Sequence, residues 1–298
     1  MIFWPALGTR VMVRYRRPDG SVPPLTDAVG HLLAVEPVVR LQTKTGAVVE
    51  CSPADVVVVR VLTFAPVRTS DIRALEHAAA KAWPGVEHTW LEGWLLRAGR
   101  PTSKGTGLPA NSAVPLDMSA RLSTIPAIVA WYEHRGLTPR LAIPDRLLPV
   151  PTGSTGEHPE SVLVRDVTDM AAGEPDPSVT LSARPHDAWL QTFGHDTDVD
   201  VLTAVSDGEL MFGAHPGAAA ARAAVTEAPD GTRWVGLSAI RGTDDPAVTA
   251  LCEALLAWGA GRGATRGYVA VPDTDANTGW LGFRLHHHRR YFPVRRDT

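Results

Sequence analysis

The sequence has few cysteines, few lysines and no long apolar run. Its two cysteines, Cys51 and Cys252, exclude a disulfide framework, and no CxxC pair offers a zinc site. Lysine occurs only three times among the 29 basic residues, which we interpret as the composition of a GC-rich coding sequence. No stretch approaches the roughly 18 apolar residues of a membrane-spanning helix, and residues 1–17 lack the apolar core of a signal peptide. We therefore expect a cytoplasmic protein without a membrane partner.

Net charge is also small, because 29 Lys and Arg face 32 Asp and Glu, which gives −3 over 298 residues. A general nucleic-acid binder presents a broad basic field, so a nucleic-acid partner is not favoured. Hydrophobic residues make up 44% of the chain and charged residues 20%, as in ordinary globular proteins. This length and composition predict two domains or three small ones.

Residues 1–66 are predicted to form a small β-barrel of the SH3-like kind. Short Val-rich segments with partial alternation favour strands, and turn signals such as Pro18-Asp19-Gly20 separate them. The predicted strands cover residues 10–15, 28–35, 38–42, 47–51 and 56–62. Five short strands in about 55 residues are typical of such a barrel. An accessory packing role and a ligand-binding role both stay open for it.

Residues 67–149 change to a helical period and form a second predicted segment. A helix is predicted over 71–83, because apolar residues recur on one face and Ser70 can cap its start. The further predicted elements are strands over 90–97, 111–116 and 140–143 and a helix over 126–136. Residues 150–160 are rich in Pro, Gly, Ser and Thr without an apolar pattern, so they are predicted to be a linker.

Residues 161–298 again alternate strands and helices. A long helix is predicted over 247–262, where Val248, Leu251 and Leu255 follow the helical spacing. The other predicted elements are a helix over 185–191 and strands over 162–166, 209–214, 219–226, 233–240, 268–271 and 289–294. An antiparallel meander followed by a helix and another strand predicts an α+β fold, with a mixed sheet and helices.

This order of elements resembles the GNAT acyltransferases, in which a central strand leads directly into an acyl-CoA-binding helix. The matching residues are the strand 234–240, the loop 241–246 and the helix from Ala247. The whole chain resembles an actinobacterial group of GNAT proteins with an N-terminal SH3-like barrel. The stretches that carry this resemblance, in order, are 68–73, 94–97, 110–112, 131–137, 201–204, 234–239 and 281–287. Residues 67–149 then form an N-terminal GNAT-like half, which a tandem arrangement would make a degenerate copy of the C-terminal one.

The resemblance implies an N-acyltransferase that uses acetyl-CoA and acts on an amine of a small molecule or a protein. In this fold the central strand splays from its neighbour, the pantetheine arm bonds to its free backbone groups, and the pyrophosphate lies at the helix N-terminus. The implied acetyl-CoA site consists of Leu237, Ser238, Ala239, Ile240, Arg241, Gly242, Thr243, Ala247 and Val248. Asn111 and Ser112 match a family motif, and they are expected either to line the substrate cleft or to form a structural turn.

Transfer by direct attack of the amine needs a base, donors for the oxyanion and an acid for the thiolate. Glu209, on the strand before the central pair, is the candidate base, and its alternative role is that of a solvent-facing strand residue. Tyr268 and Tyr291 are the candidate acids, and packing is the alternative for each. The histidines at 286–288 are not expected to bind a metal, because successive strand residues alternate faces.

Two segments depart from the family pattern. The loop 241–246 is short and carries one Gly, one Arg and two adjacent carboxylates, which disfavour a pyrophosphate. Residues 275–280 run almost directly into Leu281-Gly282-Phe283, so the helix and the tyrosine that the family carries there have no counterpart. An alternative function follows from these departures: a catalytically degenerate GNAT scaffold that acts as a binding or structural protein without turnover. The acceptor and the oligomeric state are not predicted.

Overall fold

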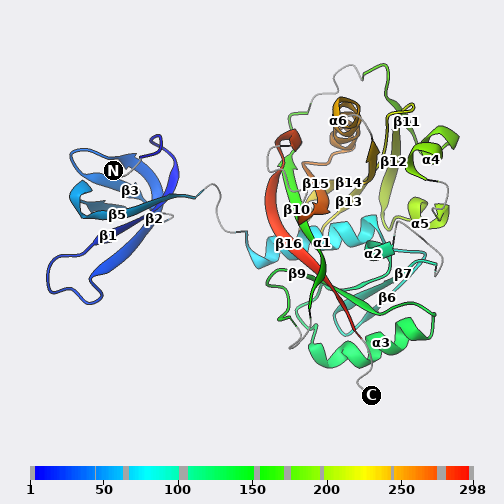
Figure 1. The fold of residues 1–298 in the computed structure, drawn as a ribbon, viewed down its shortest axis with the longest axis horizontal. Coiled ribbons are helices and arrows are strands. Elements are labelled where there is room, and N and C mark those ends of the chain that lie inside the picture. Colours follow the sequence, from blue (N-terminus) through cyan, green and yellow to red (C-terminus); the bar gives the residue numbers. More distant parts are fainter. Residues whose placement is uncertain are drawn as a thin grey trace. The chain divides into compact units, whose positions relative to one another are not determined.

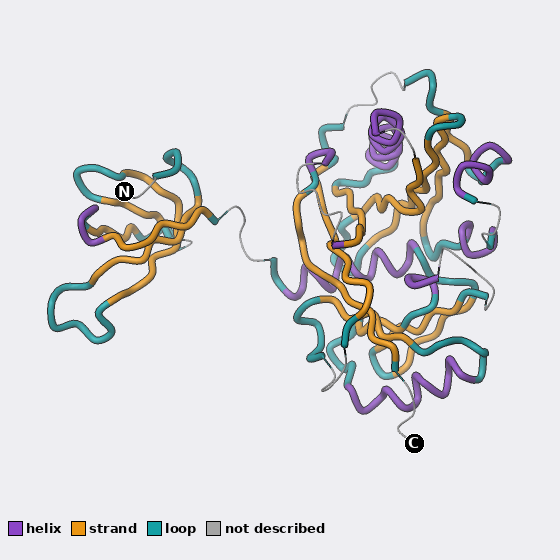
Figure 2. Tube along the Cα trace, viewed as in Figure 1, coloured by secondary structure: helices purple, strands orange, loops and turns teal. Residues whose placement is uncertain are grey.

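The structure, a computed structural model, describes residues 4–43, 45–62, 67–100, 107–150, 155–170, 176–194, 198–242, 245–273 and 280–294. The chain divides into two compact units, Met1–Pro66 and Val67–Thr298. Figure 1 labels the elements of each unit, and Figure 2 distinguishes helices, strands and loops by colour.

The first unit is a small barrel-like sheet of five antiparallel strands in the order β4-β3-β2-β1-β5 (Figure 1). The strands are β1 (Arg10–Arg16), β2 (Leu25–Ala34), β3 (Val39–Gln42), β4 (Val48–Cys51) and β5 (Val56–Val61). Because successive strand residues alternate faces, inward-facing side chains such as Val11, Val13 and Leu41 are fully buried. The prediction of a small five-stranded β-barrel is thus confirmed.

The second unit contains one mixed sheet of eleven strands in the order β11-β12-β13-β14-β15-β10-β16-β9-β8-β7-β6. The strands are β6 (Glu87–Leu91), β7 (Trp94–Ala98), β8 (Ala113–Pro115), β9 (Arg140–Pro144), β10 (Glu157–Asp166), β11 (Thr180–Ser182), β12 (Gly208–His215), β13 (Ala219–Glu227), β14 (Arg233–Gly242), β15 (Arg266–Pro272) and β16 (Arg284–Pro293). β14 is parallel to β15 and β8 to β9, whereas the other neighbouring pairs are antiparallel. β16 pairs with β10 on one side and with β9 on the other, so it joins the two parts of the sheet.

Helices cover both faces of this sheet. They are α1 (Thr69–Ala82), α2 (Gly107–Ala110), α3 (Ile125–Glu133), α4 (Asp187–Phe193), α5 (Val199–Thr203) and α6 (Asp245–Gly261). Leu251 of α6 packs in one cluster with Val235 of β14, whereas Leu75 of α1 packs in another with Trp234. Because Trp234 and Val235 are neighbours on one strand, α1 and α6 lie on opposite faces. This arrangement confirms the predicted α+β fold.

The predicted strand over 90–97 is a hairpin in the structure. β6 and β7 meet at a tight turn in which Glu92 and Gly93 have positive φ angles of 45° and 84°. A Cβ on Gly93 would lie 2.5 Å from the backbone nitrogen of Ala120, so the turn requires glycine there. The sequence hid this turn because apolar residues, Leu91 and Trp94, stand on both sides of it.

The predicted linker 150–160 ends in a strand. Residues 157–160 are the first four of β10, which lies in the middle of the sheet. Their sequence, Glu-His-Pro-Glu, has no apolar pattern because His158 and Glu160 face a cavity instead of the core. The short elements α2, α5 and β11 were also absent from the predicted elements.

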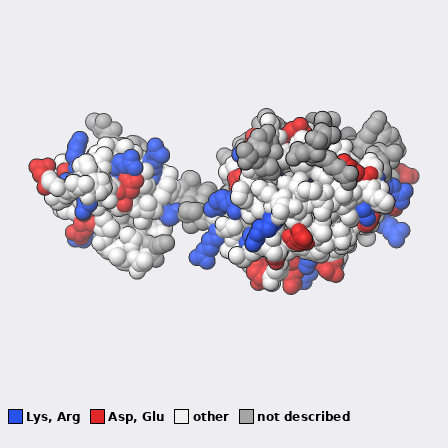
Figure 3. Space-filling model, turned by 90° about the horizontal axis from the view of Figure 1, so that it is seen from below, with Lys and Arg blue, Asp and Glu red and all other residues white. Residues whose placement is uncertain are grey.

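The structure also bears on charge and on membrane association. Among the described residues, no helix is both long and apolar enough to cross a membrane. Figure 3 shows that both basic and acidic side chains lie on the face in view of each unit. This mixture agrees with the small net charge of −3.

Candidate active site

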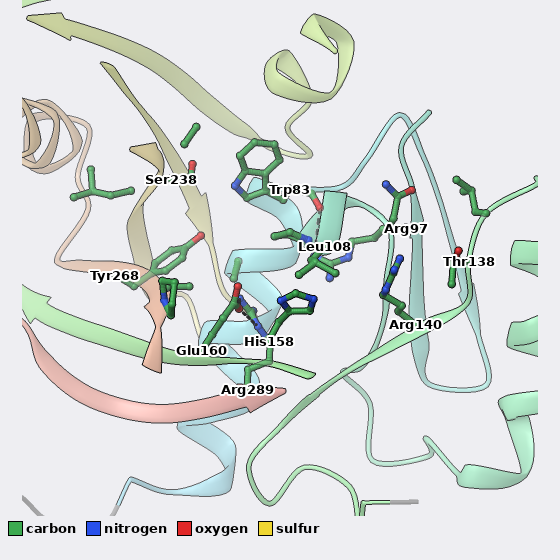
Figure 4. A pocket seen from close by; sticks show the side chains of 18 of the residues that line it. Trp83, Arg97, Leu108, Thr138, Arg140, His158, Glu160, Ser238, Tyr268 and Arg289 are labelled. Atoms are coloured by element: carbon green, nitrogen blue, oxygen red, sulfur yellow. Dashed lines mark hydrogen bonds and ion pairs between the residues drawn. The ribbon is translucent and has the colours of Figure 1, made fainter. Parts of the chain in front are cut away.

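A cavity of about 720 Å³ lies in the second unit, where β14 and β15 separate (Figure 4). The two strands are paired in parallel from Trp234 to Leu237 and from Arg266 to Val269. Beyond these residues β14 continues beside β13 alone, and β15 continues beside β10 alone. Ala79 of α1 also lines the cavity. The separation therefore leaves the backbone of β14 open to the cavity.

A β-bulge turns this part of β14 toward the cavity. β13 and β14 are in register at Arg222 with Ser238 and at Ala220 with Arg241, so β14 holds one extra residue between these pairs. Ala239 lies in this interval with a φ of 51°, a left-handed conformation that is uncommon outside glycine. Because a bulge re-aims the residues around it, Ser238, Ala239 and Arg241 all line the cavity.

Glu160 of β10 is the one carboxylate among the described lining residues (Figure 4). Its Oε2 accepts hydrogen bonds from Nε and NH2 of Arg289, at 3.0 and 2.7 Å, and from the Tyr291 hydroxyl at 3.2 Å. The other carboxylate oxygen, Oε1, has no hydrogen-bond partner among the described residues. A carboxylate that is anchored through one oxygen can accept a ligand proton with the other.

Arg289 lies between Glu160 and a second, buried carboxylate. Its NH1 donates to both oxygens of Glu76 on α1, at 3.2 and 3.1 Å, and His287 Nε2 lies 2.8 Å from Glu76 Oε1. Burial disfavours the charged form of Glu76, yet Arg289 and His287 outweigh it and lower the pKa of Glu76 to about 2. Burial likewise opposes the charge of Arg289, but the two carboxylates raise its pKa. The cluster thus fixes Glu160 against α1 and β16.

Tyr268 of β15 lines the cavity beside the separating strands (Figure 4). Gly236 of β14 makes room for it, because a Cβ at that position would overlap the Tyr268 hydroxyl. Burial raises the pKa of Tyr268 well above its usual range, and Arg222 offsets only part of this effect. The phenol therefore keeps its proton at neutral pH.

The buried guanidinium of Arg222, on the neighbouring strand β13, supports β14. Arg222 of β13 is fully inaccessible, and its NH1 donates to Ser238 Oγ at 3.2 Å. It also donates to three backbone carbonyl oxygens at 2.7, 2.8 and 2.9 Å, those of Ala82, Leu202 and Ala204. Burial lowers the pKa of Arg222 to about 9. Its guanidinium carbon lies 4.2 Å from the ring centroid of Trp83, a cavity residue, so Arg222 holds α1 and the bulge together.

The wall across from Tyr268 comes from β7, β9 and the chain after β7. Arg97 of β7 is 3% exposed, and it donates to Ser112 Oγ at 2.9 Å and to the Trp83 carbonyl at 3.3 Å. Asn111 lines the cavity, and its Oδ1 accepts a backbone N–H at 2.7 Å. Arg140, the first residue of β9, lies in the same wall. This wall therefore presents guanidinium groups to the cavity.

The residues expected to bind acetyl-CoA fall into two groups. Leu237, Ser238, Ala239 and Arg241 line the cavity. The others lie where β14 meets α6: Ala247 is buried in the core there, Ile240 and Val248 pack against it, and a Cβ on Gly242 would overlap Val248. Thr243 lies outside the described residues. β14 ends at Gly242 and α6 begins at Asp245, so the connection spans two residues, as the short loop in the sequence implied.

The base predicted from the sequence lies elsewhere. Glu209, at the start of β12, forms ion pairs with Arg262 and, at 3.8 Å, with Arg233, and it is not among the described lining residues. The sequence already placed Glu209 at the start of its strand, but it did not show that this residue is outside the described lining of the cavity. The geometry therefore does not support Glu209 as the base.

The remaining predicted residues divide between the cavity and its support. Tyr268 and Asn111 line the cavity. Tyr291 does not line it, because its buried hydroxyl points to Glu160 instead. Ser112 is fully buried behind the wall, where it holds Arg97. Tyr291 and Ser112 thus position other residues.

Several charged lining residues were not singled out from the sequence, among them Glu160, Arg97, Arg140 and Arg289. Arg97 had a usable signal, because it ends an apolar run that begins at Trp94, and a buried arginine in a strand needs partners. Glu160 had no usable signal, because its segment has no apolar pattern and was interpreted as a linker.

Comparisons with known proteins agree with this architecture. A family model described as "Probable histone acetyltransferase Rv0428c C-terminal" matches residues 69–292, and one described as "Rv0428c N-terminal Sm-like domain" matches residues 5–60. The protein named "Probable histone acetyltransferase Rv0428c" from Mycobacterium tuberculosis is 65% identical over 245 residues, which cover 82% of this chain and 79% of that protein. A solved GCN5-related N-acetyltransferase from Kribbella flavida is 14% identical, with a TM-score of 0.50 over 77% of this chain and 96% of its own. This last likeness shows a shared fold.

Proposed function

Since this chain belongs to the family of probable histone acetyltransferases with an Sm-like N-terminal domain, we propose that it transfers the acetyl group of acetyl-CoA to an amine. One observation carries the proposal: β14 separates from β15 and opens a bulged backbone into a cavity that also holds Tyr268 and Glu160. The mycobacterial relative is named for histones. For this chain the proposal covers an amine of a small molecule or of a protein.

The residues of β14 fit the acyl-bearing arm of acetyl-CoA. Backbone groups of residues 238–241 are not paired with β15 and can bond to the amides of the arm, while Arg241 offers a cation at the same edge. Bound there, acetyl-CoA supplies an activated thioester. The start of α6 fits the pyrophosphate less well, because Asp245 lies in its first turn and repels a second anion.

Glu160 is the base in this proposal. Its Oε2 is held by Arg289 and Tyr291, and its Oε1 is available to take a proton from the acceptor ammonium, directly or through one water. His158 lines the cavity two residues earlier and is exposed to solvent. We assign the role to Glu160 because its position is fixed by three hydrogen bonds, and fixed geometry favours proton transfer.

Two further groups complete the proposed chemistry. Backbone N–H groups of the bulge around Ala239 stabilise the negative charge that develops on the acyl oxygen. Tyr268 is the proposed proton donor to the departing thiolate, because its phenol carries a proton and it lines the cavity beside the separating strands.

Acetyl transfer and acetyl-CoA binding test this proposal separately. Transfer to a panel of amines is measured by release of free CoA, with Glu160→Gln expected to lower kcat roughly 100-fold or more and Tyr268→Phe about tenfold. Glu209→Gln is the matched control, because it removes a carboxylate that lies outside the cavity, and it should leave kcat unchanged.

Calorimetric titration with acetyl-CoA gives the result that could overturn the proposal. No binding of acetyl-CoA at about 1 mM would overturn the proposal and favour a degenerate scaffold without turnover. Equal rates for Glu160→Gln and Glu209→Gln would remove Glu160 from the mechanism. In that case His158→Ala becomes the variant to measure.

A further inference from the structure

Guanidinium groups outnumber carboxylates in the cavity. Among the described residues that line it, the only carboxylate is that of Glu160, and the arginines are Arg97, Arg100, Arg140, Arg241 and Arg289. Arg289 is neutralised by Glu76 and Glu160, and Arg100 pairs with Asp198 and Asp200. An excess of cations therefore remains after the ion pairs are counted.

The three remaining arginines belong to two sides of the cavity. Arg241 lies on β14, the side that the proposed function gives to acetyl-CoA, and its guanidinium is 5.2 Å from the Phe193 ring. Arg97 and Arg140 lie on β7 and β9. Figure 4 shows both on the side of the cavity away from Tyr268, with His158 and Glu160 between. They therefore face the space that is left for the acceptor.

Neither of these two arginines meets a carboxylate among the described residues. Arg97 donates to the Ser112 hydroxyl and to the carbonyls of Ser112 and Trp83, all of them neutral acceptors. Its remaining two N–H groups have no partner within the described part of the chain. Burial lowers the pKa of Arg97, which is the sign of a cation kept in place without a direct counterion.

Arg140 is less satisfied still. Its Nε is buried and has no hydrogen-bond partner among the described residues. A buried donor without an acceptor destabilises a folded protein, so such a group is rare and calls for an explanation. Arg140 also lines the cavity, so an anionic ligand there would neutralise a guanidinium that meets no carboxylate of the described residues.

We propose that the acceptor carries an anionic group close to its amine, and that Arg140, assisted by Arg97, binds this group. The proposal rests on the proposed function, because it orients the acceptor with its amine toward Glu160 and its anion toward β7 and β9. A planar guanidinium suits a carboxylate or a phosphate equally well, since both accept two parallel hydrogen bonds. The acceptor class is therefore an anionic primary amine.

The same charges disfavour a strongly basic acceptor. A lysine flanked by further lysines or arginines would bring cations against Arg97 and Arg140, and like charges repel most where water is excluded. The sign of the effect thus separates the two kinds of acceptor. Removing the charge of Arg140 should slow acetylation of an anionic amine and speed that of a lysine-rich peptide.

Matched amines test the proposal. We expect kcat/KM for 4-aminobutanoate and for 3-aminopropylphosphonate to exceed that for butylamine at least tenfold in the wild-type protein. Arg140→Gln should lower kcat/KM for the anionic amines roughly 10- to 100-fold and change that for butylamine by about twofold at most. Arg140→Lys should restore part of the preference, because it returns the charge without the planar fork. Of the two anionic amines, the better one identifies the anion.

Arg184→Gln is the matched control. Arg184 is exposed and outside the described lining of the cavity, so its loss makes the same change in net charge and should leave all three amines unaffected. Thermal unfolding of both variants shows whether Arg140→Gln remains folded. Equal use of butylamine and the anionic amines by the wild-type protein, or a preference that survives in Arg140→Gln, would overturn the inference.

Binding measurements separate this inference from the proposed function. Calorimetry with 4-aminobutanoate and butylamine in the presence of CoA reports selectivity without turnover. Selective binding that Arg140→Gln abolishes, combined with no acetylation of any amine, would support the anion site and overturn the acetyltransferase proposal. Acetylation without selectivity would support the acetyltransferase proposal and overturn the anion site.

Discussion

Apart from the short helix α2 between β7 and β8, the two halves of the second unit contain the same succession of elements: an antiparallel hairpin, a further strand, a helix and a parallel strand. In the N-terminal half these are β6, β7, β8, α3 and β9, and in the C-terminal half β12, β13, β14, α6 and β15. The prediction of a degenerate copy of the GNAT fold requires this order. The copy itself remains a proposal.

The halves differ in the length of the central strand and in what they offer to the cavity. β14 has ten residues and continues past its parallel partner, whereas β8 has three and pairs with β9 only at Ala113 and Leu141. The long strand exposes main-chain groups, and the N-terminal half contributes side chains, those of Arg97, Asn111 and Arg140. The N-terminal half thus presents guanidinium groups to the cavity, whereas the C-terminal half presents strand backbone together with side chains such as that of Tyr268.

The largest effect is expected from a substitution in the buried cluster of Arg289, Glu76 and Glu160, which lies between the two halves. Arg289→Met removes the cation between Glu76 and Glu160 and leaves two carboxylates without their counterion, so the free energy of unfolding should fall by about 3–5 kcal/mol. Denaturation by urea measures the change. Arg290→Met is the control, because Arg290 is the next residue on β16 but is exposed, and it should cost about 0.5 kcal/mol or less. Similar losses in the two variants would show that the buried cluster does not bind the halves together.

A second effect depends on pH and tests α1, the helix that carries Glu76. The pKa of Glu76 falls from 4.5 to about 2 on folding, so its contribution of about 3 kcal/mol is present above pH 4.5 and is lost as pH falls toward 2. We expect Glu76→Gln to lack this part of the acid sensitivity, as seen in urea unfolding between pH 6 and pH 3. Glu209→Gln should keep it, since Glu209 pairs outside this cluster. The same acid dependence in wild type and Glu76→Gln would contradict the assignment.

The smallest expected effect sharpens the role of the C-terminal half as the backbone side of the cavity. Asp245→Asn removes a negative charge from the first turn of α6 and should tighten acetyl-CoA binding about two- to fivefold. Calorimetric titration measures the affinity, and Asp169→Asn, at an exposed turn, is the control. Weaker binding in Asp245→Asn would mean that the phosphates do not approach this helix end.

The sequence predicted those parts of the fold whose side chains follow a buried face. The barrel strands and α6 carry clear periods of two and 3.6 residues, because one side of each packs in a core. The start of β10 carries no period, since it borders the cavity, and Glu160 was lost with it. Asn111 was chosen from a family motif and Tyr268 as a candidate acid, and both line the cavity, whereas the candidate base Glu209 is not among the described lining residues. A sequence orders the strands along the chain, but the cavity depends on which strands become neighbours in the sheet.

The place of β16 in the sheet has a consequence for the protein during its synthesis on the ribosome. It follows the other ten strands along the chain, yet it lies in the interior of the sheet, between β10 and β9. During synthesis, β9 and β10 therefore leave the ribosome long before β16, the strand that pairs with one edge of each. Until it arrives, each presents a row of unpaired backbone groups, the kind of edge on which aggregation begins.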